Sequence, residues 1–382
     1  YGHEGTDDPL LAALQREGDD DDDDDSGLAS RRGGWDSGMN TISFDELRRA
    51  TNNFDAGCRI GDGGSCVVYR ATLGGCECAV KLLSAEAELM EVKQFAAEVE
   101  VLTRVKHPHL VELYAYSTDG GSGCKCLVLE LMDGALDSRL LAAGTGTGKG
   151  KGTGKGTDTD KGEPALGWRQ RVQIILSVCR ALVHLHSLTP KPLIHRDVKS
   201  QNVLLLGFEG DELDGESVAK LADFGTVRED TRNSDGRLRT SQQTHASTAN
   251  VIGTRPYIAP EYARKGHVSE KTDAYSMGVL IIELLISEYF VATDPGVMAH
   301  TFCLEARELI DDEMDDTLAA AIEAKSAGFA QCSWASSAEA RQAAKALAAV
   351  AVKCVRGALK RSTPEEVLPE LERLARGALR TS

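Results

Sequence analysis

The stretch LIHRDVKSQNVLLL occupies residues 193–206, and KLADFGTVRED follows at residues 220–230. Each is an apolar run broken by charged residues. In the first, Asp197 is suited to orient an attacking hydroxyl and accept its proton, and Lys199 to neutralise charge on a phosphoryl group. Asn202 and Asp223 offer the oxygen ligands that Mg²⁺ prefers. The spacing predicts phosphoryl transfer, which needs positioning, a metal ion and cationic groups more than covalent chemistry from the protein.

A glycine-rich turn lies upstream in RIGDGGSCVVYRATL, residues 59–73. Gly61, Gly63 and Gly64 precede a strand-like alternation, and glycine lets backbone N–H groups come close to phosphate oxygens. Because such turns are common, this motif alone is weak evidence for a nucleotide site. Its companions on the next strand and helix decide the interpretation.

Lys81 lies in the apolar segment CAVKLL, 17 residues after Gly64. A lysine on a buried strand face needs an anion, and its place after a glycine-rich hairpin suits the α- and β-phosphates of a nucleotide. Glu98 lies on the helix face that also carries Phe95 and Leu102. Its carboxylate needs a cation, and Lys81 is the obvious one. A purely structural ion pair is the alternative.

Strand signals dominate the first part of the chain and helix signals the second. CVVYRATL, CECAVKLL and CKCLVLELM are typical of strands, whereas EVKQFAAEVEVLTRV has apolar residues at helical spacing. Four further helices are predicted, the second of them buried because it is apolar nearly all round: WRQRVQIILSVCRALVHLHS, TDAYSMGVLIIELLIS, AEARQAAKALAAVAVKCV and PEEVLPELERLARGAL. The predicted fold class is α+β, with a small β-rich lobe holding one key helix and a larger, mainly helical lobe.

Five segments are predicted along the chain. In TISFDELRRATNNF, Ser43 is placed to cap a helix whose third residue is Glu46, as in a capping box. Phe44, Leu47 and Phe54 are expected to anchor this helix to a core. The predicted boundaries are an acidic disordered tail at 1–40, the capped helical segment at 41–53, the small lobe at 54–132, the large lobe at 133–377 and, within it, a flexible Gly/Thr/Lys insertion at 143–164.

Composition narrows the classes of partner. The chain has 382 residues, 42% of them apolar, and a formal net charge of -16. A net negative charge disfavours binding to nucleic acid and to anionic membrane surfaces. No apolar run reaches the roughly 20 residues that span a bilayer, so no membrane span is expected. The chain begins at Tyr1 rather than Met, so a cytoplasmic protein and the cytoplasmic part of a longer membrane receptor both stay open.

Ten cysteines are scattered through the sequence and are interpreted as mostly reduced thiols. Cys76 and Cys78 lie two positions apart, as do Cys124 and Cys126, which places each pair on one face of a strand. Four such cysteines are enough for a zinc site in principle. The usual two-residue gap is missing and no histidine accompanies them, which favours small residues in neighbouring strands.

Together these motifs resemble those of the eukaryotic-type protein kinases, over roughly residues 54–377. The resemblance implies a bilobal kinase fold, ATP and Mg²⁺ as cofactors, and proteins as substrates. The site residues it implies are Lys81 and Glu98 for the α- and β-phosphates, Asp197 as catalytic base with Lys199 beside it, and Asn202 and Asp223 for Mg²⁺.

The resemblance also places the adenine. The backbone from Glu130 to Met132 is expected to bind the adenine edge, with Leu129 as gatekeeper and with Val68 and Ala79 packed on the ring. The remaining implied nucleotide contacts are Ile60, Gly61, Gly63 and Gly64.

Four segments sharpen the resemblance: FDELRRATNNF, VLTRVKHPHLVEL, HRDVKSQNVLL and GHVSEKTDAYSMGVLIIELL. They resemble the plant receptor-like and receptor-associated kinases, which are related to Pelle and the interleukin-1-receptor-associated kinases. This implies phosphorylation of serine and threonine, which Lys199 and Thr254 support. Signalling is the implied role, with an upstream receptor or adaptor as a further partner.

The segment GTRPYIAPEY matches the end of a kinase activation segment. There the resemblance implies an ion pair between Glu261 and Arg361, and it implies that Asp273 braces the catalytic loop. In the family, an arginine such as Arg196 pairs with a phosphorylated residue of this segment. By distance from Thr254, the favoured phosphorylation sites are Thr248 and then Ser247.

Two positions depart from the family pattern. Cys66 stands where the third glycine of the loop is usual, and Pro256 replaces a glycine near the substrate-binding surface. Because the backbone at the first two glycines makes most of the close contacts with phosphate, activity is expected to survive. Cys66 is interpreted as an inert small residue rather than a reactive thiol.

The favoured function is an active Ser/Thr protein kinase. One alternative is a nucleotide-binding pseudokinase or scaffold, which loss of Lys81, Asp197 or Asp223 would have favoured; all three are present. The other is a small-molecule kinase of related fold, which the GT…APE segment disfavours.

Overall fold

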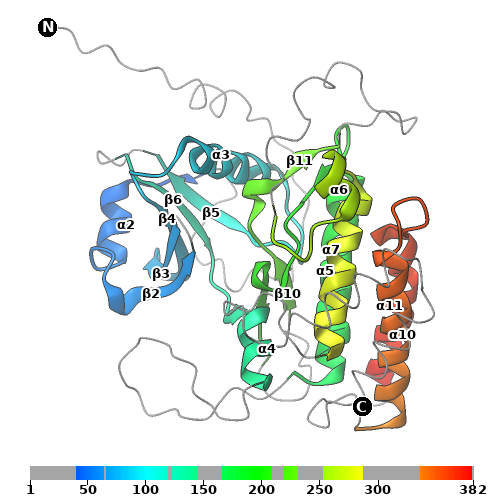
Figure 1. Cartoon of the computed structure of the whole chain (residues 1–382). Coiled ribbons are helices and arrows are strands. Elements are labelled where there is room, and N and C mark those ends of the chain that lie inside the picture. The colour runs from blue at the N-terminus through cyan, green and yellow to red at the C-terminus, as the bar shows by residue number, and fades with distance from the viewer. Residues whose placement is uncertain are drawn as a thin grey trace, which may run out of the picture. The chain divides into compact units, whose positions relative to one another are not determined.

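The computed structural model describes residues 40–63, 66–118, 123–144, 166–208, 218–230, 253–286 and 336–380. The chain divides into two compact units (Figure 1). Residues up to Lys106 belong to the first unit together with Glu112–Leu131, and the second contains His107–Val111 and the chain from Met132 onward. The predicted tail at 1–40 and insertion at 143–164 fall almost wholly outside the described residues.

A six-stranded sheet forms the first unit, in the order β1-β5-β6-β4-β3-β2. β1 pairs with β5 in parallel and the other pairs are antiparallel. The elements are β1 (Asn40–Thr41), α2 (Phe44–Ala50), the 3₁₀ turn η1 (Ala56–Cys58), β2 (Arg59–Gly63), β3 (Cys66–Leu73), β4 (Cys76–Leu83), α3 (Leu89–Arg104), β5 (Leu113–Ser117) and β6 (Lys125–Glu130).

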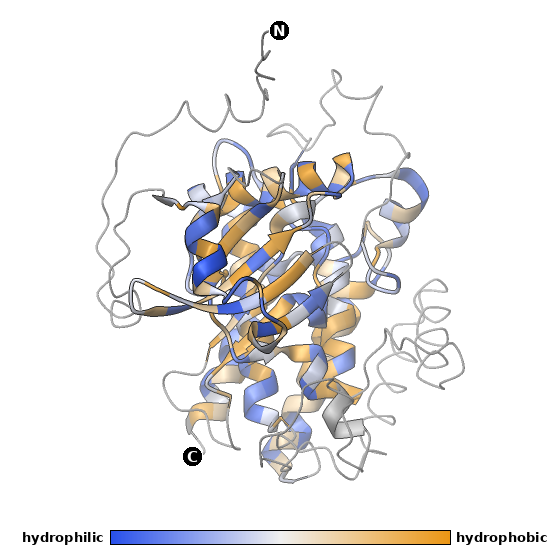
Figure 2. Ribbon diagram, turned by 90° about the vertical axis from the view of Figure 1, so that its left-hand side faces the viewer, coloured by the Kyte–Doolittle hydropathy of each residue, from blue (hydrophilic) through white to orange (hydrophobic). Residues whose placement is uncertain are grey.

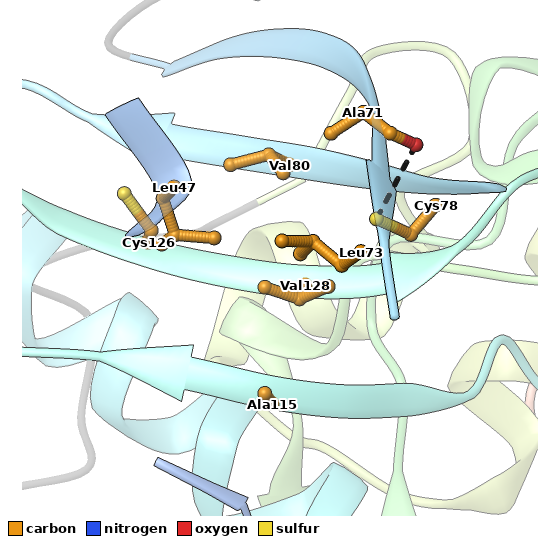
Figure 3. Close-up of a cluster of buried hydrophobic side chains, with 8 residues drawn as sticks. All are labelled: Leu47, Ala71, Leu73, Cys78, Val80, Ala115, Cys126 and Val128. Carbon is orange, nitrogen blue, oxygen red and sulfur yellow. Dashed lines mark hydrogen bonds between the residues drawn. The ribbon is translucent and has the colours of Figure 1, made fainter. Parts of the chain in front are cut away.

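One face of this sheet carries the core of the first unit. The buried cluster there consists of Leu47, Ala71, Leu73, Cys78, Val80, Ala115, Cys126 and Val128 (Figure 3). The Cys78 thiol donates to the Ala71 carbonyl at 3.6 Å, and burial raises the pKa of Cys78 to about 12. Cys78 and Cys126 therefore act as small apolar residues of the core. Because side chains alternate along a strand, Ala79 and Lys81 lie on the opposite face.

The short helix α2 covers that core face. The backbone N–H of Glu46 donates to Ser43 Oγ at 3.2 Å, which confirms the predicted cap. Leu47 is fully buried, and the Phe44 and Phe54 rings pack against the same cluster with their centroids 5.4 Å apart. The three predicted anchors are thus confirmed.

The second unit is mainly helical, as predicted. Its elements are β7 (Gly134–Ala135), α4 (Leu136–Gly144), α5 (Trp168–Ser187), β8 (Leu193–Ile194), η2 (Ser200–Asn202), β9 (Val203–Leu206), β10 (Val218–Leu221), η3 (Phe224–Thr226), β11 (Arg228–Glu229), α6 (Pro260–Lys265), α7 (Glu270–Ile286), α10 (Ala338–Val355) and α11 (Pro364–Arg380). Every residue of α7 from Thr272 to Ile286 is buried, and Figure 2 shows hydrophobic residues gathered on the strands and inner helices. The prediction of a buried central helix is confirmed.

One predicted boundary is wrong in detail. The sequence assigns all of 54–132 to the small lobe, but His107–Val111 and Met132 belong to the second unit. The reason is a pair of backbone hydrogen bonds, from Leu221 N to His109 O at 2.9 Å and from Val111 N to Leu221 O at 3.0 Å. They attach this short segment to the end of β10, a contact that no local pattern reports.

Candidate active site

In the first unit, Lys81 of β4 and Glu98 of α3 form the predicted ion pair. Lys81 Nζ lies 2.7 Å from Glu98 Oε2, and the two side chains are 22% and 4% exposed. A buried carboxylate is costly unless a cation accompanies it. The pair therefore compensates the buried carboxylate and holds the Lys81 ammonium in one orientation.

The sheet register gathers other predicted nucleotide contacts on the Lys81 face. Val68 pairs with Lys81 across β3 and β4, and Leu129 pairs with Ala79 across β4 and β6. Directly paired residues share a face, and so do residues two apart on one strand. Lys81 therefore shares its face of the sheet with the apolar side chains of Val68, Ala79 and Leu129.

The glycine-rich segment is partly described. Ile60, Gly61 and Gly63 lie in β2, where Gly61 pairs with Val68; Gly64 lies outside the described residues. Ile60 is 47% exposed, and its role in nucleotide binding stays a prediction.

Glu130 and Met132 fall in different units. The Glu130 carboxylate accepts a hydrogen bond from Glu112 N at 2.8 Å, and Glu130 N donates to Glu112 O at 3.0 Å, which holds the end of β6 in place. Their shared role in adenine binding stays a prediction.

In the second unit, the Asp197 carboxylate collects three donors. Lys199 Nζ donates to its Oδ2 at 2.7 Å and Asn202 Nδ2 to the same oxygen at 3.1 Å. The Thr254 hydroxyl donates to Oδ1 at 3.3 Å, and Lys199 Nζ in turn donates to Thr254 Oγ1 at 3.0 Å. Three predicted site residues, two from the HRDVKSQN motif and one from the GT motif, therefore converge on one carboxylate and fix its orientation.

Asp273 of α7 holds the loop that carries Asp197. Its carboxylate is fully buried and accepts from the backbone N–H groups of His195 and Arg196, each at 2.8 Å. His186 Nε2 lies 2.9 Å away. Burial acts to raise the pKa of Asp273, but its hydrogen bonds and the nearby histidines outweigh burial and lower it. These contacts are the ones that the predicted bracing requires, and the role of Asp273 stays a prediction.

Two site residues have left-handed backbone conformations that are unusual outside glycine. The φ angle is 71° at Arg196 and 66° at Asp223. Such conformations cost about 1–3 kcal/mol and persist where surrounding contacts over-determine them. At Arg196 the bond to Asp273 does so. At Asp223 the conformation begins η3, whose Phe224 packs edge-on against the His195 ring at 5.3 Å.

Asn202 and Asp223 fit the divalent cation that the sequence predicts. Ala222 N donates to Asn202 O at 2.8 Å, which ties the two loops together. Asn202 Nδ2 is engaged by Asp197, so the amide offers its oxygen. No group of three or more His, Cys, Asp and Glu side chains arranged for a metal occurs within the described part of the chain. One carboxylate and one amide oxygen suit a Mg²⁺ that phosphate oxygens complete.

Arg196 directly precedes Asp197 in the catalytic loop and is buried. Its guanidinium donates to Thr226 O and to the Tyr262 hydroxyl, the latter at 3.4 Å. Burial lowers the pKa of Arg196, and the charge of nearby Arg228 lowers it further. Sequence analysis missed Arg228, for which its position soon after DFG is the available signal. Thr248 and Ser247 lie outside the described residues.

The predicted pair of Glu261 and Arg361 is present. Arg361 Nη2 donates to Glu261 Oε2 at 3.2 Å, and Nη1 donates to Oε1. The buried guanidinium also donates to Lys271 O at 2.9 Å and lies over the Tyr275 ring, 4.9 Å from its centroid. These contacts join α6 to the turn before α11.

Comparison with known proteins agrees with this geometry. The family described as protein kinase domain matches residues 54–370. The chain therefore belongs to the protein kinase domain family.

Its relatives include plant receptor-like kinases, as the sequence predicts. Receptor-like kinase TMK4 of Arabidopsis thaliana is 35% identical over 294 residues, which is 75% of this chain and 28% of the relative. Receptor protein kinase WSS1 of Oryza sativa subsp. japonica is 33% identical over 276 residues, 71% of this chain and 26% of the relative. U-box domain-containing protein 52 of Arabidopsis thaliana is 36% identical over 251 residues, 65% of this chain and 26% of the relative. The chain thus spans about a quarter of the length of these proteins.

Proposed function

We propose that this chain is an active protein kinase that transfers the γ-phosphate of ATP to serine and threonine hydroxyls of proteins. The observation that carries the proposal is the Asp197 carboxylate held by Lys199, Asn202 and Thr254. A pseudokinase or scaffold has no need of a carboxylate oriented by three donors beside a lysine. The intact Lys81–Glu98 pair supports the same proposal.

Each described residue has a distinct part in the proposed reaction. Asp197 orients the acceptor hydroxyl and takes its proton. Lys199 stabilises negative charge on the phosphoryl group, and Thr254 keeps Lys199 and Asp197 together. Asn202 and Asp223 would hold Mg²⁺, which neutralises phosphate charge when bound. Lys81 anchors the α- and β-phosphates while Glu98 keeps its ammonium in place.

We further propose that phosphorylation of the activation segment raises activity, at Thr248 first and Ser247 next. Arg196 and Arg228 support this, because two neighbouring guanidinium groups favour a phosphate between them. The proposed setting is cytoplasmic signalling downstream of a receptor or adaptor. Within the described residues, no helix combines the length and apolar character needed to cross a membrane.

The test is phosphate transfer from Mg-ATP by the purified chain to itself and to a generic basic protein. Phosphoserine and phosphothreonine formed by the wild type and lost in Asp223→Asn are the expected result. Nucleotide binding without transfer by the wild type would establish the scaffold alternative instead. Thr248→Ala is expected to lower activity and autophosphorylation more than Ser247→Ala does, and equal activity of Thr248→Ala and wild type would refute that site.

A further inference from the structure

The turn that joins α2 to the first strands of the sheet has an unusual backbone. Three consecutive residues, Asn52, Asn53 and Phe54, have φ angles of 50°, 61° and 55°, which are left-handed values that residues other than glycine seldom adopt. Such a backbone persists where surrounding contacts over-determine it. Thr51 supplies these contacts, because its fully buried hydroxyl donates to Leu47 O at 2.8 Å and accepts from Phe54 N at 3.1 Å. The turn therefore fixes the direction in which the chain carries Phe54 away from α2.

Phe54 is the middle ring of an aromatic stack. Its ring centroid lies 5.4 Å from that of Phe44 in α2 and 5.3 Å from that of Tyr69 in β3, and the second pair meets edge to face. Tyr69 is buried and pairs with Val80 of the core cluster, so its side chain lies on the core face of the sheet. Because an edge-to-face contact is directional as well as apolar, the stack links α2 to one defined position of β3.

That position is the base of the glycine-rich hairpin. Tyr69 lies opposite Arg59 at the start of β2, and the register of the two strands shifts between Arg59 and Gly61. In the described six-stranded sheet β2 lies at the edge, beside β3. Glycines weaken a strand because they have no side chain to pack, and β2 contains Gly61 and Gly63. The contact of Phe54 with Tyr69 therefore restrains the hairpin where its own side chains contribute little.

We propose that Phe54 is a positioning residue for nucleotide binding, which sets the place of the glycine-rich hairpin by holding Tyr69. The inference rests on the proposed function, because it concerns the hairpin that is proposed to contact ATP. Val68 precedes Tyr69 in β3 and points to the opposite face, where it pairs with Lys81. Val68 also pairs with Gly61 of β2. A shift of Tyr69 therefore moves both hairpin residues relative to Lys81.

An ordinary core contact is the alternative to a positioning role. Such a contact would stabilise the first unit without a particular effect on the nucleotide. Phe54 is only partly buried where it packs against the core cluster, so it contributes less to the burial of apolar surface than the fully buried members do. Its place beside the base of the hairpin is what favours positioning.

The first experiment compares wild type, Phe54→Leu, Phe54→Tyr and the control Leu73→Val in steady-state kinetics with ATP varied. Phe54→Leu keeps an apolar side chain but loses the ring, and its KM for ATP should rise about threefold to tenfold, as loss of one aromatic pair allows, with little change in kcat. Phe54→Tyr keeps the ring and should restore the KM. Leu73→Val trims the same core at the far end of β3 (Figure 3) and should lower the Tm without raising that KM.

A double-variant cycle tests whether the two rings act as a pair. Tyr69→Leu should raise the KM for ATP as Phe54→Leu does, and the protein with both changes should show no further rise. Effects that multiply in the double variant would mean that the two rings act independently, which overturns the inference. A lowered Tm of Phe54→Leu with an unchanged KM also overturns it and leaves an ordinary core contact.

Hydrogen exchange of the nucleotide-free chain tests the positioning without phosphate transfer. In Phe54→Leu, the backbone amides of β2 and of the paired part of β3 should exchange faster than in wild type, whereas those of β5 and β6 keep their rates. Unchanged exchange, or exchange that rises equally in every strand of the sheet, overturns the inference. Absence of phosphate transfer by the wild type refutes the proposed function instead, and the exchange rates still decide whether Phe54 holds the hairpin.

Discussion

The lysine of the first unit and the carboxylate of the second are held in contrasting ways. The Lys81 ammonium is oriented by Glu98, on a helix that forms no part of the sheet. The Asp197 carboxylate has three donors of its own, and its loop is bonded twice to the buried Asp273. The first arrangement depends on where one helix lies, whereas the second is over-determined. The position of α3, and with it the orientation of Lys81, is therefore altered more easily than the orientation of Asp197.

Asp273→Asn is expected to have the largest effect, because Asp273 accepts the two backbone hydrogen bonds that hold the catalytic loop. Phosphate transfer should fall at least about a hundredfold as the loop shifts. The free energy of unfolding should fall by about 3–5 kcal/mol. The reason is that His186 and two backbone N–H groups lose the buried carboxylate with which they interact. Autophosphorylation rates and urea unfolding measure both. Lost activity with unchanged stability would contradict the anchoring role, and Glu77→Gln at the surface serves as the control.

Glu98→Gln removes the ion pair that orients Lys81 in the first unit. The isosteric amide keeps the shape of α3 but removes the charge that orients Lys81, so activity should fall by about tenfold to a hundredfold. Stability should change by less than about 1 kcal/mol, because a neutral amide is easier to bury than a carboxylate. Steady-state kinetics with ATP varied, together with thermal unfolding, separates the two quantities. A loss of stability as large as that of Asp273→Asn would remove the contrast between the units.

Acid should weaken the attachment of His107–Val111 to the second unit. Burial is the largest cause that lowers the pKa of His107 and His109 from 6.5 to about 4, and Arg180 and Lys220 add to it. Both rings are thus neutral in the folded protein, while the unfolded chain takes up protons below pH 6.5. Stability should therefore decline as pH falls from 6.5 towards 4, by roughly 1 kcal/mol per ring after allowance for partial exposure.

Urea unfolding at several pH values measures that decline. His107 stacks on His184 with ring centroids 4.7 Å apart, so His107→Phe retains a stacked ring without a titrating group. The variant should show a shallower decline than wild type between pH 6.5 and 4. Identical slopes for the two proteins would exclude His107 as a contributor.

Ser43→Ala should have the smallest effect. It removes the oxygen that accepts from Glu46 N at the start of α2, which costs about 1 kcal/mol of stability. Activity should be unchanged, because α2 covers the sheet face opposite to Lys81. The expected shift is seen by thermal unfolding, and a fall in phosphate transfer would show that the cap influences the Lys81 face.

Much of the local structure is predictable from periodicity. The segments predicted as β3, β4, α5 and α10 coincide with the observed elements, because alternation and helical spacing are local properties. The strand β5 was not predicted, because its five residues LYAYS form a strand mainly through pairing with β6. The residue types of the site were also predictable, because each motif carries its own chemistry.

The missed features depend on distant parts of the chain. His107–Val111 belongs to the second unit because β10 bonds it. Arg228 becomes noteworthy only beside Arg196. No local pattern marks the attachment of His107–Val111, and the position of Arg228 soon after DFG is its one local signal.

By itself the sequence determined the class of protein, the order of its elements and the residues able to carry phosphoryl transfer. Only the tertiary structure decided which of them meet: Lys199 with Thr254, 55 positions on, and Arg196 with Asp273, 77 positions on. The physical reason is that periodicity and motif spacing record interactions between near neighbours. The burial of Asp273 and the sharing of the Asp197 carboxylate arise only when packing brings remote segments together.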